Sequence, residues 1–261
     1  MLLTSVVIVL REFLEAALII SVLLAVSDEL SIPRRWVRWG IGIGLAGALA
    51  YAANTAAVSD WLDGVGQEVV NAMLQIAVYC CLILVALLFS RRRPPEGSLG
   101  ANLAILMTVA VGLAVAREGS EIMIYLSGFA GDRTLLQPVV LGGMVGAGIG
   151  TSVGALTYYL LINIGSQWSM RVIIALIALI AAGLLSQATA LLIQADWLPA
   201  QLPLWNTSGW LPESSIVGQL LYAVIGYEAT PTPIQTLIHV GGLLLPLALV
   251  LLQRPDTTSH D

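Results

Sequence analysis

The chain has 261 residues, of which 58% are hydrophobic and only 10% are charged, whereas a soluble domain carries roughly a quarter charged residues. Its 11 basic residues are all arginine, and with 16 acidic residues they give a formal net charge of −5. This composition excludes a nucleic-acid-binding protein, which needs a basic face, and a disordered chain, which needs low hydrophobicity. We therefore expect an all-α protein that crosses a lipid bilayer several times.

Seven apolar stretches are long enough to span a bilayer, whose core needs about 20 residues per helix. In chain order they cover roughly residues 2–26, 37–58, 69–90, 103–127, 138–162, 172–194 and 233–252, which predicts a polytopic bundle of seven transmembrane helices. The fifth stretch carries glycines at every fourth position, a spacing that lets helix backbones approach closely: Gly142, Gly146, Gly150 and Gly154. The apolar segment from Ile216 to Ile225 is too short to span, so we expect a re-entrant or interfacial helix there.

The arginines between these stretches orient the bundle. With seven spans, eight arginines lie on one side of the membrane and only Arg133 lies on the other. The eight are Arg34, Arg35, Arg38, Arg91, Arg92, Arg93, Arg171 and Arg254. Because cytoplasmic loops of membrane proteins carry the excess of basic residues, we expect an integral membrane protein whose N-terminus lies outside and whose C-terminus lies in the cytoplasm.

An internal repeat relates the first three stretches to the next three. The segment Arg11-Glu12-Phe13-Leu14-Glu15 matches Arg117-Glu118-Gly119-Ser120-Glu121, 106 residues later, and Gly-Ala-Leu-x-Tyr recurs from Gly47 and from Gly154. Because each unit has an odd number of spans, the second enters the membrane from the opposite face, as in many transporters. We expect two inverted three-helix repeats, residues 1–92 and 93–194, then an outer connection, 195–232, and a seventh helix with a cytoplasmic tail, 233–261.

Each motif places two glutamates on one face of a helix, with an arginine within reach. An ionisable group in the middle of a span costs about 2.5–3.5 kcal/mol, so these six groups must face inward, where the two motifs meet within about 10 Å. Four glutamates against two arginines leave a formal charge of −2, which predicts a bound hard cation. Proton carriage by the same glutamates and a purely structural clamp of internal salt bridges remain open as alternatives.

The two Arg-Glu-x-x-Glu motifs, in the first and fourth of seven spans, resemble the high-affinity iron permease family, which includes fungal ferroxidase-coupled permeases and bacterial EfeU-type permeases. The resemblance covers most of the chain and extends to Gly226-Tyr227 before the last span. It implies a bacterial inner-membrane transporter, not an enzyme, that imports iron oxidised outside from Fe²⁺ to Fe³⁺. It assigns ion binding to the motif glutamates, with the arginines as their charge partners: Glu12, Glu15, Glu118 and Glu121, with Arg11 and Arg117.

The resemblance also implies the partners of the chain. Iron is the transported substrate and no cofactor is bound permanently; since the chain has no ferroxidase motif, oxidation requires a separate extracytoplasmic ferroxidase or peroxidase. Phe13 and Ser120 replace the usual motif residues, and Asn71 stands where an acidic partner of Glu68 is expected. The alternatives are therefore a permease for another divalent or heavy-metal cation and a non-transporting membrane subunit with structural salt bridges.

Acidic residues in the outer connection are candidates for an entrance that collects cations, and a solvated face is the alternative interpretation. These residues are Asp196, Glu213 and Glu228.

The arginine distribution makes a testable prediction about topology. A reporter that is active only in the cytoplasm should work when fused after Arg254, and it should be inactive when inserted near Ser208. Measured reporter activity in whole cells checks both fusions. The reverse pattern would refute the orientation and the inverted repeat together.

Overall fold

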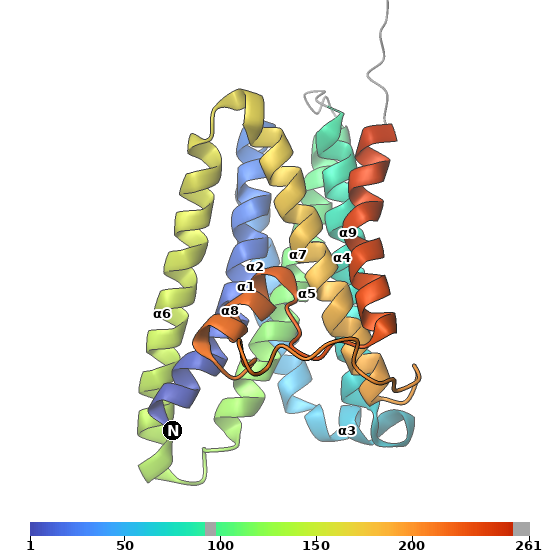
Figure 1. Ribbon diagram of the computed structural model, residues 1–261. Coiled ribbons are helices and arrows are strands. Elements are labelled where there is room, and N and C mark those ends of the chain that lie inside the picture. The colour runs from blue at the N-terminus through green and yellow to red at the C-terminus, as the bar shows by residue number, and fades with distance from the viewer. Residues whose placement is uncertain (92–97, 253–261) are drawn as a thin grey trace, which may run out of the picture.

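The computed structural model describes residues 1–91 and 98–252, and within these ranges every regular element is helical (Figure 1). The elements are α1 (Leu2–Glu29), α2 (Arg35–Ala53), α3 (Thr55–Asp60), η1 (Trp61–Gly64), α4 (Gly66–Ser90), α5 (Ser98–Ser127), α6 (Arg133–Asn163), α7 (Ser166–Gln194), α8 (Ile216–Ile225) and α9 (Pro233–Leu252). The all-α prediction is confirmed, and α8 has the predicted bounds. Arg92, Arg93, Arg254 and the predicted repeat boundary after residue 92 lie outside the described residues.

Five helices are long and apolar enough to cross a membrane: α4, α5, α6, α7 and α9. They correspond to five of the seven predicted stretches. α1 corresponds to the first stretch and has 28 residues, or about 42 Å at the helical rise of 1.5 Å per residue. It is long enough to cross a hydrocarbon core of about 30 Å, but every 18-residue stretch of it holds at least three charged residues, whereas each of the five has such a stretch with at most two.

The second predicted stretch, residues 37–58, differs from expectation because its helix is interrupted. α2 ends at Ala53, and the chain bends by 70° into the segment Thr55–Gly64. The side chain of Asn54 donates to the Ala50 carbonyl oxygen at 2.8 Å, and the Thr55 hydroxyl donates to the Ala52 carbonyl oxygen at 2.9 Å. Such local side-chain bonds satisfy backbone carbonyls at a helix end and so compete with continuation of the helix.

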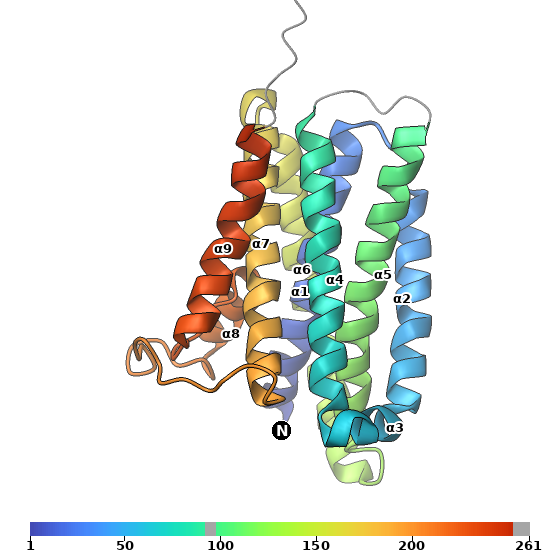
Figure 2. The same ribbon diagram turned by 90° about the vertical axis from the view of Figure 1, so that its right-hand side faces the viewer.

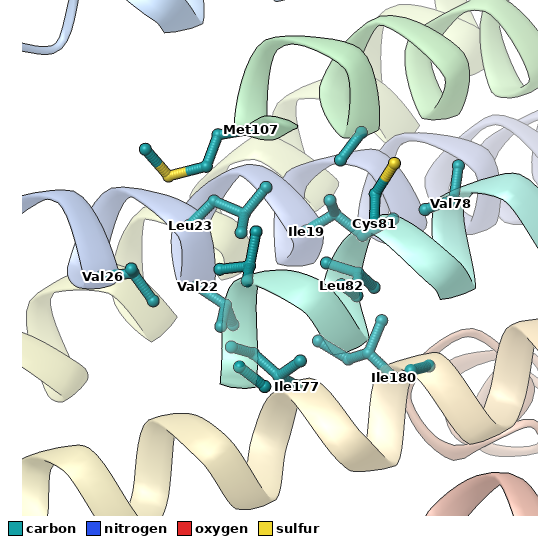
Figure 3. Close-up of a cluster of buried hydrophobic side chains, with 14 of the residues drawn as sticks. Ile19, Val22, Leu23, Val26, Val78, Cys81, Leu82, Met107, Ile177 and Ile180 are labelled. Atoms are coloured by element: carbon teal, nitrogen blue, oxygen red, sulfur yellow. The ribbon is translucent and has the colours of Figure 1, made fainter. Parts of the chain in front are cut away.

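The long helices stand side by side in one bundle (Figures 1 and 2). α1 packs chiefly along α6, α2 along α5, and α4 along α7, while α9 packs on α7. The centre of the bundle is filled by apolar side chains of α1, α4, α5 and α7, including the fully buried Leu23, Leu82, Met107 and Ile177 (Figure 3). α1 and α5, which carry the charged motifs, are thus inner helices.

The glycines of α6 form the contact with α1. A Cβ atom added to Gly146 would lie 2.5 Å from the Val6 carbonyl oxygen and 2.8 Å from the Leu10 nitrogen, and one added to Gly154 would lie 2.6 Å from the Ala17 Cβ. Real Cβ atoms do not come so close to atoms of a neighbouring helix. The predicted role of the glycine stripe in close helix packing is therefore confirmed.

This contact predicts unequal effects of two alanine substitutions in α6. Gly146→Ala should force α1 and α6 apart and lower stability by about 1–3 kcal/mol, as overpacking does elsewhere. Gly148→Ala is the matched control, because a Cβ there meets nothing within 4 Å and alanine favours the helix over glycine. Thermal unfolding of the purified variants, followed by tryptophan fluorescence, measures both. Equal melting temperatures for the two variants would contradict the packing role.

Candidate metal centre

The two charged motifs meet where α1 and α5 lie together in the interior. Arg117 Nη1 on α5 lies 3.1 Å from Glu15 Oε2 on α1. One carboxylate oxygen from each of Glu12, Glu118 and Glu121 also lies within 4.8 Å of the other two. The prediction that the motifs converge within about 10 Å is therefore confirmed.

Arg117 is the cation that organises this cluster. Besides Glu15, its guanidinium contacts Glu118 Oε1 at 2.6 Å and Glu121 Oε1 at 3.1 Å. Its side chain is only 5% exposed, so these contacts are made out of solvent, where charge-assisted hydrogen bonds are strong. One positive charge thus lies against three carboxylates drawn from both helices.

Arg11, the matching residue of the first motif, has a different environment. Its Nε atom lies 3.4 Å from Glu15 Oε1 and 3.6 Å from Glu12 Oε1, and its side chain is 24% exposed. Its guanidinium carbon lies 4.2 Å from the centre of the Tyr222 ring of α8. The two motifs match in sequence, but Arg11 makes longer ion pairs and is more exposed than Arg117.

Two carboxylate oxygens of the cluster have no hydrogen-bond donor among the described residues. They are Glu12 Oε2 and Glu118 Oε2, both fully buried. A buried polar atom without a partner costs free energy, and a bound cation would remove that cost. Ligand oxygens around an ion with metal–oxygen bonds of about 2.1 Å lie about 3–4 Å apart. The oxygens of Glu12, Glu118 and Glu121, within 4.8 Å of one another, would have to approach by at most about 1–2 Å to reach that spacing.

Amide side chains of α4 adjoin the cluster. Asn71 Nδ2 donates to Glu121 Oε1 at 3.4 Å, and Gln75 Nε2 donates to Gln187 Oε1 of α7 at 2.6 Å. The Asn71 Oδ1 and Gln75 Oε1 atoms are buried and accept no hydrogen bond within the described part of the chain. Gln75 and Gln187 were missed by the sequence analysis. The available signal was their polarity inside two otherwise apolar stretches.

A cavity of about 600 Å³ begins at Glu12 and Glu118 and lies among α1, α2, α5 and α6. Its walls are mostly apolar, and Tyr158 of α6 stands at its other end. There the Tyr158 hydroxyl donates to Asp28 Oδ2 at 2.6 Å, beside the Asp28–Arg34 ion pair of 2.8 Å. The cavity therefore extends from the carboxylates toward the end of the bundle where α1 is connected to α2.

Two acidic residues of the outer connection are hydrogen-bonded within that connection and to α9. Glu213 Oε1 accepts from the Ala229 backbone N–H at 2.6 Å, and Glu228 Oε2 accepts from Gln235 Nε2 at 3.3 Å. Burial and the adjacent Glu213 carboxyl raise the pKa of Glu228 to about 7. Asp196 is exposed beyond the end of α7. The structure thus brings Glu213 and Glu228 together and leaves Asp196 separate.

Comparison with known proteins supplies a family and relatives. Residues 2–253 match the model of the Iron permease FTR1 family. The chain is 27% identical over 277 residues to a protein of Escherichia coli O6:H1 named Ferrous iron permease EfeU, an alignment that covers 97% of this chain and 96% of that protein. It is 29% identical over 248 residues to a protein of the same name from Shigella sonnei, with 86% of each chain covered. No solved structure shows significant similarity to the chain.

The unequal environments of the two arginines predict unequal losses of stability. Arg117→Gln would leave Glu15, Glu118 and Glu121 without their shared cation, and breaking buried pairs in this way costs about 3–5 kcal/mol. Arg11→Gln should cost less, because its ion pairs are longer and partly exposed. Thermal unfolding of both purified variants tests the order. A larger loss for Arg11→Gln would show that Arg117 does not organise the cluster.

Proposed function

Because the chain belongs to the Iron permease FTR1 family, we propose that it imports iron and that the ion binds in the carboxylate cluster between α1 and α5. Membership of this family makes the chain a membrane transporter and not an enzyme. The observation that carries the binding proposal is the group formed by Glu12, Glu118 and Glu121, with two buried oxygens that lack donors. Oxygen ligands of this kind suit hard cations.

The four motif glutamates have different roles in this proposal. Glu12, Glu118 and Glu121 are the ligands, whereas Glu15 is engaged by Arg117 and Arg11 and holds α1 against α5. Glu121 contacts Arg117 as well, so it must exchange that partner for the ion. While the site is empty, the arginines offset the electrostatic repulsion between the neighbouring carboxylates, because like charges so close together are unfavourable.

The donor atoms and the formal charge of the site favour different oxidation states of the ion. A set of carboxylate oxygens without nitrogen or sulfur favours Fe³⁺, delivered after a separate extracytoplasmic ferroxidase or peroxidase has oxidised Fe²⁺. The formal charge of −2 is neutralised by a divalent ion, which makes Fe²⁺ or another divalent metal the second candidate. The name of the similar enterobacterial proteins refers to ferrous iron. We propose Fe³⁺ as the bound species because the donor set is uniformly hard.

The helix contacts support two inverted repeats. In the proposed repeat, α1, α2 and α4 of the first unit correspond to α5, α6 and α7 of the second. The α1–α6 contact then has the α2–α5 contact as its counterpart, and both are extensive. The third helices of the two units, α4 and α7, pack against each other. In this arrangement α1 and α2 are the two remaining spans and α9 is the additional seventh helix. The arginine distribution then places the N-terminus outside a bacterial cell membrane and the C-terminus in the cytoplasm.

The route of the ion follows from this orientation. α8 and the connection that holds Glu213 and Glu228 lie at the same end of the bundle as the N-terminus (Figure 1), so we assign the entrance to them and to Asp196. The cavity from Glu12 and Glu118 to Tyr158 extends toward the opposite end and is the release route. Its apolar walls offer no strong second binding site, which favours departure of the ion.

The proposal is tested by Glu12→Gln and Glu118→Gln, with Asp63→Asn as the control that removes the same charge from an exposed position. Uptake of labelled iron into proteoliposomes should fall by about tenfold or more in the two Gln variants, because a hard cation loses an anionic ligand. The Asp63→Asn protein should transport at the parent rate. Separate assays with Fe²⁺, Fe³⁺, Mn²⁺ and Pb²⁺ identify the ion. Folded Gln variants with parental uptake would end the carboxylate-site proposal.

A further inference from the structure

We propose that Tyr222 of α8 is a positioning residue that holds the Arg11 guanidinium ready to leave the Glu12 carboxylate when the ion binds. This inference rests on the proposed function, because it requires Glu12, a carboxylate that Arg11 contacts, to be a ligand of the ion. The geometry that points to it is the 4.2 Å distance between the guanidinium carbon of Arg11 and the centre of the Tyr222 ring. That distance lies well within the range of a cation–π interaction.

The ion pairs of Arg11 are those of a group that can be displaced. Its Nε atom lies 3.4 Å from Glu15 and 3.6 Å from Glu12, beyond the 2.7–2.9 Å of a strong charged hydrogen bond. Arg117 contacts its carboxylates at 2.6–3.1 Å and is 5% exposed, against 24% for Arg11. Of the two arginines, Arg11 is therefore the one that can move away at lower cost.

The position of the Tyr222 ring is fixed by both ends of α8. At the N-terminal end, the Ser215 hydroxyl accepts from the Gly218 N–H at 3.0 Å, which is a standard helix cap. At the C-terminal end, Gly226 has a positive φ of 64°, and a Cβ atom on it would lie 2.5 Å from the Gly183 Cα of α7. α8 also contacts α1. The ring is thus held against Arg11 by a helix that packs closely on α7.

Ion binding changes the partners of Arg11 but not those of the ring. In the empty site, Arg11 is shared between the ring and the carboxylates of Glu12 and Glu15. When Glu12 turns to the ion, Arg11 loses that carboxylate and is repelled by the arriving cation. Arg11 then keeps two partners, the Glu15 carboxylate and the ring, so it depends more on the ring than before. Tyr222 therefore stabilises the ion-bound state more than the empty state, and this difference lowers the ion concentration needed for half-maximal uptake.

The test compares Tyr222→Leu, which removes the ring, with Tyr222→Phe, which retains it. Iron uptake into proteoliposomes should show a KM raised by about 3- to 30-fold in Tyr222→Leu, the range that corresponds to a partly desolvated cation–π contact. The maximal rate should change by less than about twofold, because on this proposal the ring stabilises the bound site and the transition state for transport equally. Tyr222→Phe should retain the parental KM. Should Tyr222→Leu purify poorly, Tyr222→Met fills a similar volume without a ring and replaces it.

The outcomes separate this inference from the function on which it rests. If Glu12→Gln transports as well as the parent, the proposed function fails. If uptake requires Glu12 but Tyr222→Leu and Tyr222→Met keep the parental KM, or lower only the maximal rate, the positioning role fails alone. A raised KM in Tyr222→Phe as well would also overturn it, because the ring would then not be the group that matters.

Discussion

The ion pairs made by the guanidinium of Arg117 are the interactions on which the rest of the structure depends. This guanidinium lies 3.1 Å from Glu15 on α1 and 2.6 and 3.1 Å from Glu118 and Glu121 on α5. A charge in an apolar interior is strongly unfavourable without a partner, so α1 and α5 can be buried only together. The shared cation fixes the register of the two helices as well as their proximity. Because of that register, the remaining carboxylate, Glu12, faces those of α5.

Close backbone contacts place α2 and α6 around this pair. A Cβ atom on Gly44 of α2 would lie 2.6 Å from the Val115 Cβ of α5, and one on Gly146 of α6 would lie 2.5 Å from the Val6 carbonyl oxygen of α1. Lipid provides no hydrophobic force between helices, so small residues and close van der Waals contact hold them together. α1 is therefore covered by the glycine-bearing α6, and α5 by the glycine-bearing α2. The cavity that reaches Glu12 and Glu118 lies among these four helices.

The charged cluster could be predicted from the sequence because ionisable residues in apolar stretches are rare and must face inward. The bend after Ala53 could not be predicted, because hydropathy does not report the side-chain hydrogen bonds of Asn54 and Thr55 that end α2. The difference in exposure and ion-pair distance between Arg11 and Arg117 could not be predicted from the sequence either. Their local sequences match, and the Tyr222 ring that Arg11 contacts is distant along the chain and reaches Arg11 only in the folded protein.

On the proposal of two inverted units, α8 belongs to neither unit and makes the two faces of the site unequal. A site with identical surroundings on both faces would present a bound ion with the same barrier in each direction. Here the side of α8 carries the guanidinium of Arg11 beneath the Tyr222 ring, which repels a cation. The opposite side carries an apolar cavity that leads to Tyr158. On this proposal, an ion that has displaced Arg11 from Glu12 has that guanidinium behind it. At the far end of the cavity, the guanidinium of Arg34 is paired with Asp28 at 2.8 Å, so its charge is compensated and release toward Tyr158 is favoured.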